Sequence, residues 1–505
     1  MISTPSRPWL KLDSALWWLL LAFGVGVGVF FRVSGLGSLA FYLDEHLHTH
    51  QAILLLNGGE LTYTRSFLPV TLPVALSFKL FGISWFKARL PMVVINLLAA
   101  LPLYFITKRF GKPAAFLSLF LYFTNPFIIA SARGVREYAV LPLFFYTAIL
   151  LAFTIPNGGR RKAALWASLA LAVYLLAFDT RGFAVLSLIP LILLAGLQAL
   201  AWLRQNGRAW HWALLVLLSI AAIIGIVLRV YASQKAADIN NGPLQFSFQN
   251  IFLEAITTSV WQHGYWLPAL GWLLLILVLG MIFGGWFNKF GMASQGVLLL
   301  GGTYILVFLF LSFLMGADGF VMRPRYGVLL ETLSIPVWGV ALPWLTNQAA
   351  SRLPRSVPTG IIAGVAFVAL FTNPQALNLI YTFHGGIPFP ITGNLHYRNA
   401  EAYEYIAQRI KPGDVAMMDR FYYNDEMYGY RWGDFQWVKA NDYLTDPSKE
   451  VGEQMPPLQE GWLVLYPEAM VDRYHIPLNS FDSANVHYKW HGKFGDTLIW
   501  YWTRR

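Results

Sequence analysis

The chain has 505 residues, of which 56% are hydrophobic and only 12% are charged, and its formal net charge is +11. Ordinary soluble proteins have about 25% charged residues, so this composition excludes a soluble enzyme, a disordered chain and a fibrous protein. We therefore expect a polytopic membrane protein. The positive charge of such a protein usually lies in cytoplasmic loops, so nucleic acid is not an expected partner. The chain has no cysteine, which excludes disulfides and thiolate metal ligands.

Apolar stretches long enough to cross a bilayer recur along the chain, since a helix needs about 20 residues to do so. The first follows two basic residues and has no convincing cleavage site, so it is interpreted as a retained anchor. We expect about eleven transmembrane helices, at 14–33, 88–107, 114–131, 138–155, 163–178, 183–203, 210–231, 265–287, 294–315, 326–345 and 357–380.

Charge predicts the orientation of these helices. If the N-terminus is cytoplasmic, every cytoplasmic segment carries lysine or arginine and almost no acid, as at 108–112 and 160–162. This pattern obeys the positive-inside rule, and an odd number of spans places the C-terminus outside. We expect a multi-pass protein of the cell (plasma or inner) membrane with an extracytoplasmic tail.

Two regions outside the spans have structure of their own. The long outer loop at 35–87 holds two short helices at the membrane interface, at 45–57 and 70–82. From residue 384 the composition becomes that of a soluble domain. Its pattern predicts a helix, a turn, strands and a closing hairpin, at 397–410, 411–414, 415–418, 462–466 and 486–502. We therefore divide the chain into a transmembrane domain, 1–383, and an extracytoplasmic α/β domain, 384–505.

Adjacent carboxylates, Asp44 and Glu45, follow the outer end of the first span. A partly desolvated carboxylate there can act as a general base. The alternative is that Asp44 caps the helix that follows and Glu45 supports its dipole. Histidines at 46, 48 and 50 make a metal site conceivable, but their spacing is weakly specific. We assign no metal and no certain cofactor, and a divalent cation is not expected.

Arginines collect at the outer ends of the predicted spans, in loops that the positive-inside rule keeps poor in positive charge. The guanidinium fork suits phosphate, whereas the alternative is a set of snorkelling arginines at helix turns. The candidates and their polar neighbours are Arg133, Arg136, Glu137, Tyr138, Arg181, Arg323, Arg325 and Tyr326.

Sequence motifs for nucleotide binding, serine hydrolysis or zinc proteolysis are missing. A membrane enzyme with its site outside the cytoplasm also has no ready supply of nucleotides. A lipid-linked donor would supply its substrate instead.

Several stretches carry a family resemblance: YLDEHLHTHQAILLLNGGEL at 42–61, ALSFKLFGISWFKARLP at 75–91, TKRFGKPAAFLSLFLYFTNPFIIASA at 107–132, VREYAVLPLFF at 135–145, and RPRYGVLL with the following proline at 323–336. Together they resemble the GT-C glycosyltransferases of family 39, which include protein O-mannosyltransferases and the lipid A aminoarabinose transferase. The resemblance is dense over about 40–150 and thin beyond.

This resemblance implies an all-α GT-C bundle with an outer α/β domain. It also implies inverting transfer of one sugar from a polyprenyl phosphate to a hydroxyl of a protein, lipid or polysaccharide. Its catalytic acid falls on Asp44 and its phosphate-binding arginine on Arg136. The family's Glu-Lys-Pro-Pro-Leu segment reads Thr-Arg-Ser-Phe-Leu-Pro here, where Arg65 supplies the positive charge. The expected donor-binding set is Glu45, Arg65, Arg133, Arg136, Glu137, Tyr138, Arg181, Arg323, Arg325 and Tyr326.

Other membrane functions remain as alternatives. A transporter or flippase of lipid-linked sugars needs polar residues at mid-membrane, and only Asn96 and Thr303 are candidates. An oligosaccharyltransferase would carry a Trp-Trp-Asp type of motif in its tail, and 431–435 does not match it. The sequence favours no particular sugar, acceptor or oligomeric state.

Overall fold

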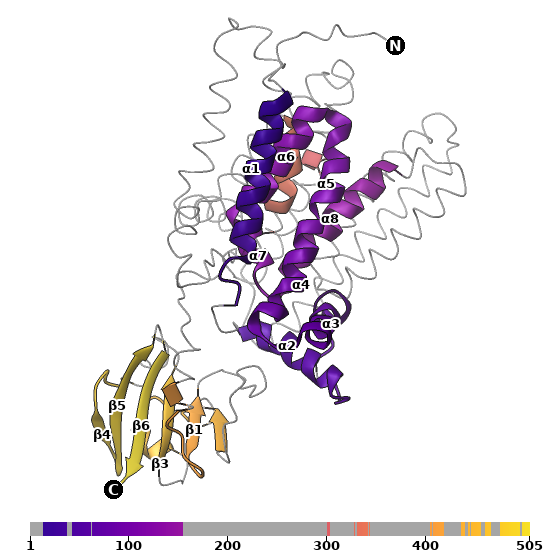
Figure 1. The fold of residues 1–505 in the computed structure, drawn as a ribbon. Coiled ribbons are helices and arrows are strands. Elements are labelled where there is room, and N and C mark those ends of the chain that lie inside the picture. Colours follow the sequence, from indigo (N-terminus) through magenta and orange to yellow (C-terminus); the bar gives the residue numbers. More distant parts are fainter. Residues whose placement is uncertain are drawn as a thin grey trace, which may run out of the picture.

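The computed structural model describes the first third of the chain almost completely, together with parts of the later helices and of the tail (Figure 1). The described residues are 14–37, 43–61, 63–154, 300–302, 328, 331–341, 343, 405–406, 408–418, 436–439, 443–444, 446–455, 460–465, 475–494 and 497–505. The predicted spans between 163 and 287 and at 357–380 lie outside this part, as does most of the span at 294–315.

Three predicted spans are confirmed as helices. α1 (Ser14–Val33) coincides with the first span and α8 (Glu137–Thr154) with the fourth. The predicted span at 88–107 is the run of α4 (Trp85–Leu98) and α5 (Ala100–Thr107). A short 3-10 turn, η3 (Lys108–Phe110), follows α5 and ends the run. Among the described residues, this run of 26 residues is the one helix long and apolar enough to cross a membrane.

The predicted span at 114–131 is two helices, which corrects the sequence analysis. α6 (Lys112–Thr124) ends at Asn125, whose backbone is extended, and α7 (Pro126–Ala132) begins at the next residue. Proline pushes the preceding residue away from helical geometry. The Asn125 side chain then accepts a hydrogen bond from the Ile128 N–H at 3.0 Å, as an N-cap residue does.

Both predicted interfacial helices are present. α2 (Leu43–Leu56) is followed by a π-helical turn, η2 (Phe67–Thr71), that leads into α3 (Leu72–Phe81). Across η2 and α3 one face is buried, with Val70, Val74 and Phe78, while a row of leucines four residues apart is exposed, so both faces are apolar. The exposed row is Leu68, Leu72, Leu76 and Leu80. α2 and α3 lie at the end of the bundle nearest the sheet of the tail (Figure 1).

Close packing of α1 against α6 depends on glycine and on a buried arginine. Gly28 of α1 faces Phe123 of α6. Arg32, fully buried, donates to the carbonyl oxygens of Gly28 and Phe123 at 2.9 and 3.2 Å, and to Asn96 Oδ1 of α4 at 3.0 Å. These bonds hold α1 against both α4 and α6.

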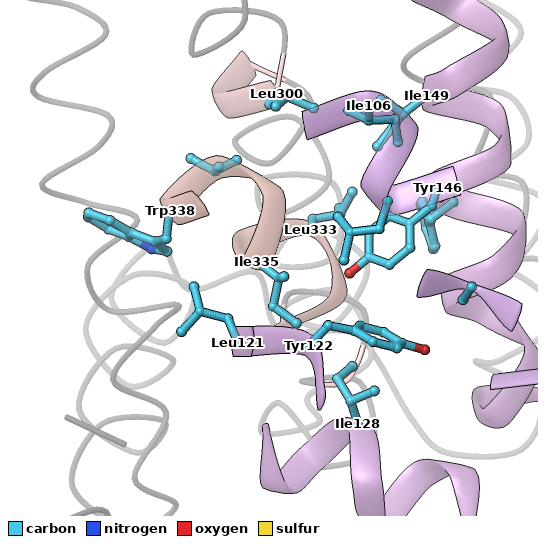
Figure 2. Packing of buried hydrophobic residues seen from close by; sticks show 14 of the residues in the cluster. Ile106, Leu121, Tyr122, Ile128, Tyr146, Ile149, Leu300, Leu333, Ile335 and Trp338 are labelled. Carbon is cyan, nitrogen blue, oxygen red and sulfur yellow. The ribbon is translucent and has the colours of Figure 1, made fainter. Parts of the chain in front are cut away.

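Aromatic and aliphatic side chains fill the interior between the early and the later helices (Figure 2). Tyr122 of α6 and Tyr146 of α8 lie 5.8 Å apart between ring centroids. The Tyr146 hydroxyl donates to the Thr332 carbonyl at 2.7 Å, so the helical residues 331–341 are part of the same core. Leu333 and Trp338 contribute to it from that segment.

In the tail, six strands form one mixed sheet in the order β2-β1-β3-β6-β5-β4. β1 pairs in parallel with β2 and β3, and the other pairs are antiparallel. The predicted strands and closing hairpin are confirmed, whereas β2 and β4 were not predicted. The strands are β1 (Val415–Met418), β2 (Gln436–Lys439), β3 (Glu460–Leu465), β4 (Phe481–Ser483), β5 (Val486–Phe494) and β6 (Thr497–Arg504).

Glycine substitutions on α1 test its packing. A Cβ atom at Gly28 would lie 2.5 Å from the Phe123 carbonyl oxygen, whereas one at Gly26 would meet nothing within 4 Å. We expect Gly28→Ala to destabilise the protein by about 1–3 kcal/mol, a usual cost of overpacking. Gly26→Ala should be neutral or stabilising, because alanine favours helix by up to about 1 kcal/mol. Thermal unfolding in one detergent measures both, and equal midpoints for the two variants would contradict this packing.

Candidate functional site

A buried ion pair organises the end of the bundle where the site residues gather. Arg89 of α4 donates from Nε and Nη2 to the two carboxylate oxygens of Glu45 at 3.0 and 2.9 Å. The exposed fractions of the two side chains are 2% and 0%. An arginine that donates two parallel hydrogen bonds to one carboxylate forms one of the strongest ion pairs found in proteins.

The same pair contacts two further segments. The Val135 N–H donates to Glu45 at 2.8 Å, and Arg89 donates to the Leu36 carbonyl at 2.9 Å. The ion pair therefore joins α2, α4, the segment before α8 and the residues that follow α1. Glu45 was predicted to bind substrate, and the structure places its carboxylate inside this network.

Asp44, the predicted catalytic residue, is the second residue of α2. The helix begins at Leu43, so Asp44 lies in its first turn rather than at the residue before it. Neighbouring helix positions are about 100° apart around the axis, so Asp44 and Glu45 occupy different positions around α2. The Asp44 side chain itself lies outside the described residues.

Arg133 binds the end of α1. Its Nη1 donates to the carbonyl oxygens of Phe31 and Ser34 at 2.5 and 2.7 Å, where the last turn of a helix leaves carbonyls without partners. Burial, and secondarily the charge of Arg89, lower the pKa of Arg133 to about 10. This residue was predicted to bind substrate, and its visible contacts are with the backbone.

Two other arginines converge on Glu137, the first residue of α8. Arg65 Nη2 lies 3.2 Å from one carboxylate oxygen of Glu137, and Arg136 Nε lies 3.6 Å from the other. The Arg136 guanidinium also lies over the ring of Tyr138, 5.6 Å from its centroid. Four residues predicted from sequence are therefore brought together in one cluster, which we call the arginine cluster: Arg65, Arg136, Glu137 and Tyr138.

In the arginine cluster, two guanidinium groups lie beside one carboxylate, that of Glu137. Arg136 and Glu137 are almost fully buried, whereas the Arg65 side chain is 32% exposed. Of the two guanidinium groups, that of Arg65 is therefore the more accessible. The cluster lies beside α2, because Val135, next to Arg136, is bonded to Glu45.

Four of the predicted site residues lie outside the described residues: Arg181, Arg323, Arg325 and Tyr326. Within the described part, no group of three or more His, Cys, Asp or Glu side chains is arranged to hold a metal ion.

Sequence reasoning missed two buried ionisable residues, Arg89 and Glu331. Arg89 begins an otherwise apolar predicted span, and an ionisable residue in such a place is a recognised signal of function or of a buried partner. Glu331, 2% exposed, accepts a hydrogen bond from Asn125 Nδ2 at 2.9 Å, also within predicted spans.

Comparison with known proteins finds no matching family model and no matching curated protein. Solved structures are similar at low sequence identity. ArnT from Cupriavidus metallidurans in the apo state is 13% identical over 97% of this chain and 98% of that one, with a TM-score of 0.49. The same protein bound to undecaprenyl phosphate is 15% identical, with the same coverage and TM-score.

The oligosaccharyltransferase of Archaeoglobus fulgidus in the apo form is 11% identical over 90% of this chain and 70% of that one, also with a TM-score of 0.49.

Breaking the buried ion pair should be costly. Arg89→Met leaves the Glu45 charge buried without its partner, and such a change typically costs about 3–5 kcal/mol. Lys79→Met, at an exposed position of α3, is the matched control and should have little effect. The double variant Glu45→Leu with Arg89→Met should recover much of the loss, because replacing both ions removes the uncompensated charge.

Denaturation midpoints of the purified variants in one detergent measure this difference. A single Arg89→Met variant as stable as Lys79→Met would show that the ion pair does not hold these segments together.

Proposed function

We propose that this chain is a membrane glycosyltransferase that moves a sugar from a polyprenyl phosphate to a hydroxyl group outside the cytoplasm, with inversion at the anomeric carbon. The observation that carries the proposal is the convergence of Arg65 and Arg136 on Glu137, beside the helix that begins with Asp44 and Glu45. Such a site offers positive charge for a phosphate and, in Asp44, a carboxylate for a base.

The arginine cluster provides the binding energy for the donor's phosphate. A guanidinium group donates two parallel bonds to phosphate oxygens, and each charge-assisted bond contributes about 1.5–3 kcal/mol. As the sugar leaves, negative charge grows on the phosphate, and arginines already in place stabilise it. A phosphate is a good leaving group, so this scheme needs neither a general acid nor a metal ion.

Asp44 acts as the base in this scheme. It takes the proton of the acceptor hydroxyl, whose oxygen attacks the anomeric carbon. The bond from that carbon to the phosphate oxygen breaks, and the electron pair leaves with the polyprenyl phosphate. A single displacement of this kind inverts the anomeric configuration. The buried pair of Glu45 and Arg89 keeps the first turn of α2 fixed while this happens.

Membrane insertion supports a lipid-linked donor. Large apolar side chains are exposed along α1 and along the α4–α5 run, where a lipid environment would cover them. Examples are Trp18, Phe23, Leu98, Leu101 and Phe105. We infer a bundle of about eleven spans over 1–383, with the N-terminus inside and the α/β domain, 384–505, outside. In that orientation the arginine cluster faces the outer leaflet, and Arg181, Arg323, Arg325 and Tyr326 would complete the site.

A transporter of lipid-linked sugars is the alternative function, because buried polar residues occur within the predicted spans. Arg32 and Asn96 bind each other, and Glu331 binds Asn125. These contacts join neighbouring helices. They therefore have a sufficient structural explanation, and the arginine cluster at the outer end favours transfer chemistry over transport.

Asp44→Asn tests the transferase directly, because it keeps the size of the side chain and removes its basicity. With a panel of undecaprenyl-phosphate sugars and an acceptor extract, the wild-type protein should release bare undecaprenyl phosphate. Turnover should fall by about 10²–10⁴-fold in the variant, the usual share of a general base, while donor binding stays unchanged. The control Glu60→Gln changes an exposed acid shortly after α2 and should keep full turnover.

Mass spectrometry identifies the product. Recovery of intact donor on the opposite leaflet of a vesicle, without bare undecaprenyl phosphate, would contradict the transferase and favour the transporter.

A further inference from the structure

A short segment between α2 and α3 carries Arg65 to the arginine cluster, and it is tied to α2 at both of its ends. Before Arg65, the Tyr63 N–H donates to Gln51 Oε1 at 3.2 Å. After it, Thr71 Oγ1 lies 3.1 Å from His48 Nδ1. Both partners belong to one helix, so the path of the chain between these two contacts decides where Arg65 lies.

The chain reverses direction at Arg65 and Ser66. The Phe67 N–H donates to the Thr64 carbonyl at 3.2 Å, so residues 64–67 form a β-turn with Arg65 and Ser66 at its centre. The backbone of Ser66 is left-handed, with φ 56° and ψ 30°. A positive φ at the third residue of a β-turn favours glycine or asparagine, and serine adopts it against the steric repulsion of its own Cβ atom.

The left-handed residue also begins the π-helical turn η2. The Ser66 carbonyl accepts hydrogen bonds from the Val70 and Thr71 N–H groups at 3.0 and 3.3 Å. η2 buries Pro69, Val70 and Thr71, and it belongs to one hydrophobic cluster with the start of α8. The chain after Ser66 is therefore held in place, so a change in the φ angle of Ser66 has to be absorbed on the side of Arg65.

We propose that Ser66 is a positioning residue for donor binding, because its left-handed backbone turns Arg65 toward Glu137 and so places one of the two phosphate-binding guanidinium groups. The proposal rests on the proposed function and deepens it. Ser66 is fully buried, the chain after it is fixed by η2, and Arg65 Nη2 lies 3.2 Å from Glu137. Strained backbone of this kind persists where the surrounding structure imposes it, and it is concentrated at ligand-binding sites.

Two substitutions separate the backbone of Ser66 from its hydroxyl group. Ser66→Gly removes the hydroxyl and adopts a positive φ readily. Ser66→Thr keeps the hydroxyl, but its branched Cβ disfavours the left-handed region. A role of the backbone predicts that Ser66→Gly retains donor binding and that Ser66→Thr loses it, whereas a role of the hydroxyl predicts the reverse. The matched controls are Ala484→Gly and Ala484→Thr, at another left-handed residue, which is exposed between β4 and β5.

The experiment measures the dissociation constant for undecaprenyl phosphate with the full chain in lipid nanodiscs. We expect Arg65→Ala and Ser66→Thr each to weaken binding about tenfold, as the loss of a charge-assisted hydrogen bond does. Ser66→Gly and both variants of Ala484 should bind within about twofold of wild type. In the Arg65→Ala background, Ser66→Thr should have no further effect, because the turn acts through Arg65.

Two results would overturn the role of Ser66. The first is a loss of binding in Ser66→Gly, which decides the question even if Ser66→Thr does not fold. The second is an equal effect of Ser66→Thr with and without Arg65, because a change in general stability would weaken binding in both backgrounds.

Other outcomes separate this inference from the function on which it rests. If Arg65→Ala binds undecaprenyl phosphate as the wild type does, while a folded Arg136→Ala variant loses it, the positioning of Arg65 is irrelevant to the donor and the inference fails, although the transferase proposal stands. A wild-type protein that does not bind undecaprenyl phosphate would instead reject the proposed donor class, and the role of Ser66 with it.

Discussion

The buried ion pair between Glu45 and Arg89 is the interaction on which the geometry of the site depends. Its two ions come from segments that are separate in the sequence, and its further bonds reach Val135 and Leu36. Burying two charges is costly, and good geometry with additional hydrogen bonds is needed to compensate. Both conditions are met here, because every polar group at the centre of the network has a partner within hydrogen-bond distance.

Neighbouring residues of like chemistry have different partners around this network. Glu45 is bound to Arg89, while Asp44 is the neighbouring position of α2, about 100° around the helix. In the same way Arg133 binds the end of α1, while Arg136 joins Arg65 at Glu137. The contacts of Glu45 and Arg133 thus hold the backbone on which the proposed phosphate-binding arginines stand, and such preorganisation lets a site stabilise charge without rearranging.

Much of the fold could be predicted from the sequence. Apolar runs of the right length predict α1, the α4–α5 run and α8, and turn residues with alternating strands predict the closing hairpin of the tail. The break between α6 and α7 was missed although Asn125-Pro126 is a local signal for it. β2 and β4 were missed because QWVK and FDS, unlike the wholly apolar VAMM of β1, have no apolar run to mark a strand and depend on their neighbours in the sheet.

The sequence predicted which residues belong to the site, but it did not predict which partner each of them binds. The sequence placed Arg133 and Arg136 together as phosphate ligands, because both are arginines at one helix turn. In the structure the two arginines have different partners. Arg133 reaches a carbonyl oxygen of α1, whereas Arg136 reaches the carboxylate of Glu137. The partnership of Glu45 with Arg89 joins positions far apart in the chain, and no local pattern reveals it.

A structure of the full chain in lipid nanodiscs with undecaprenyl phosphate, determined by electron cryomicroscopy, tests this account most directly. The account predicts phosphate density within hydrogen-bond distance of the guanidinium groups of Arg136 and Arg65, beside the first turn of α2. Phosphate bound instead at the opposite end of the bundle, near Lys108 and Arg109, would contradict it.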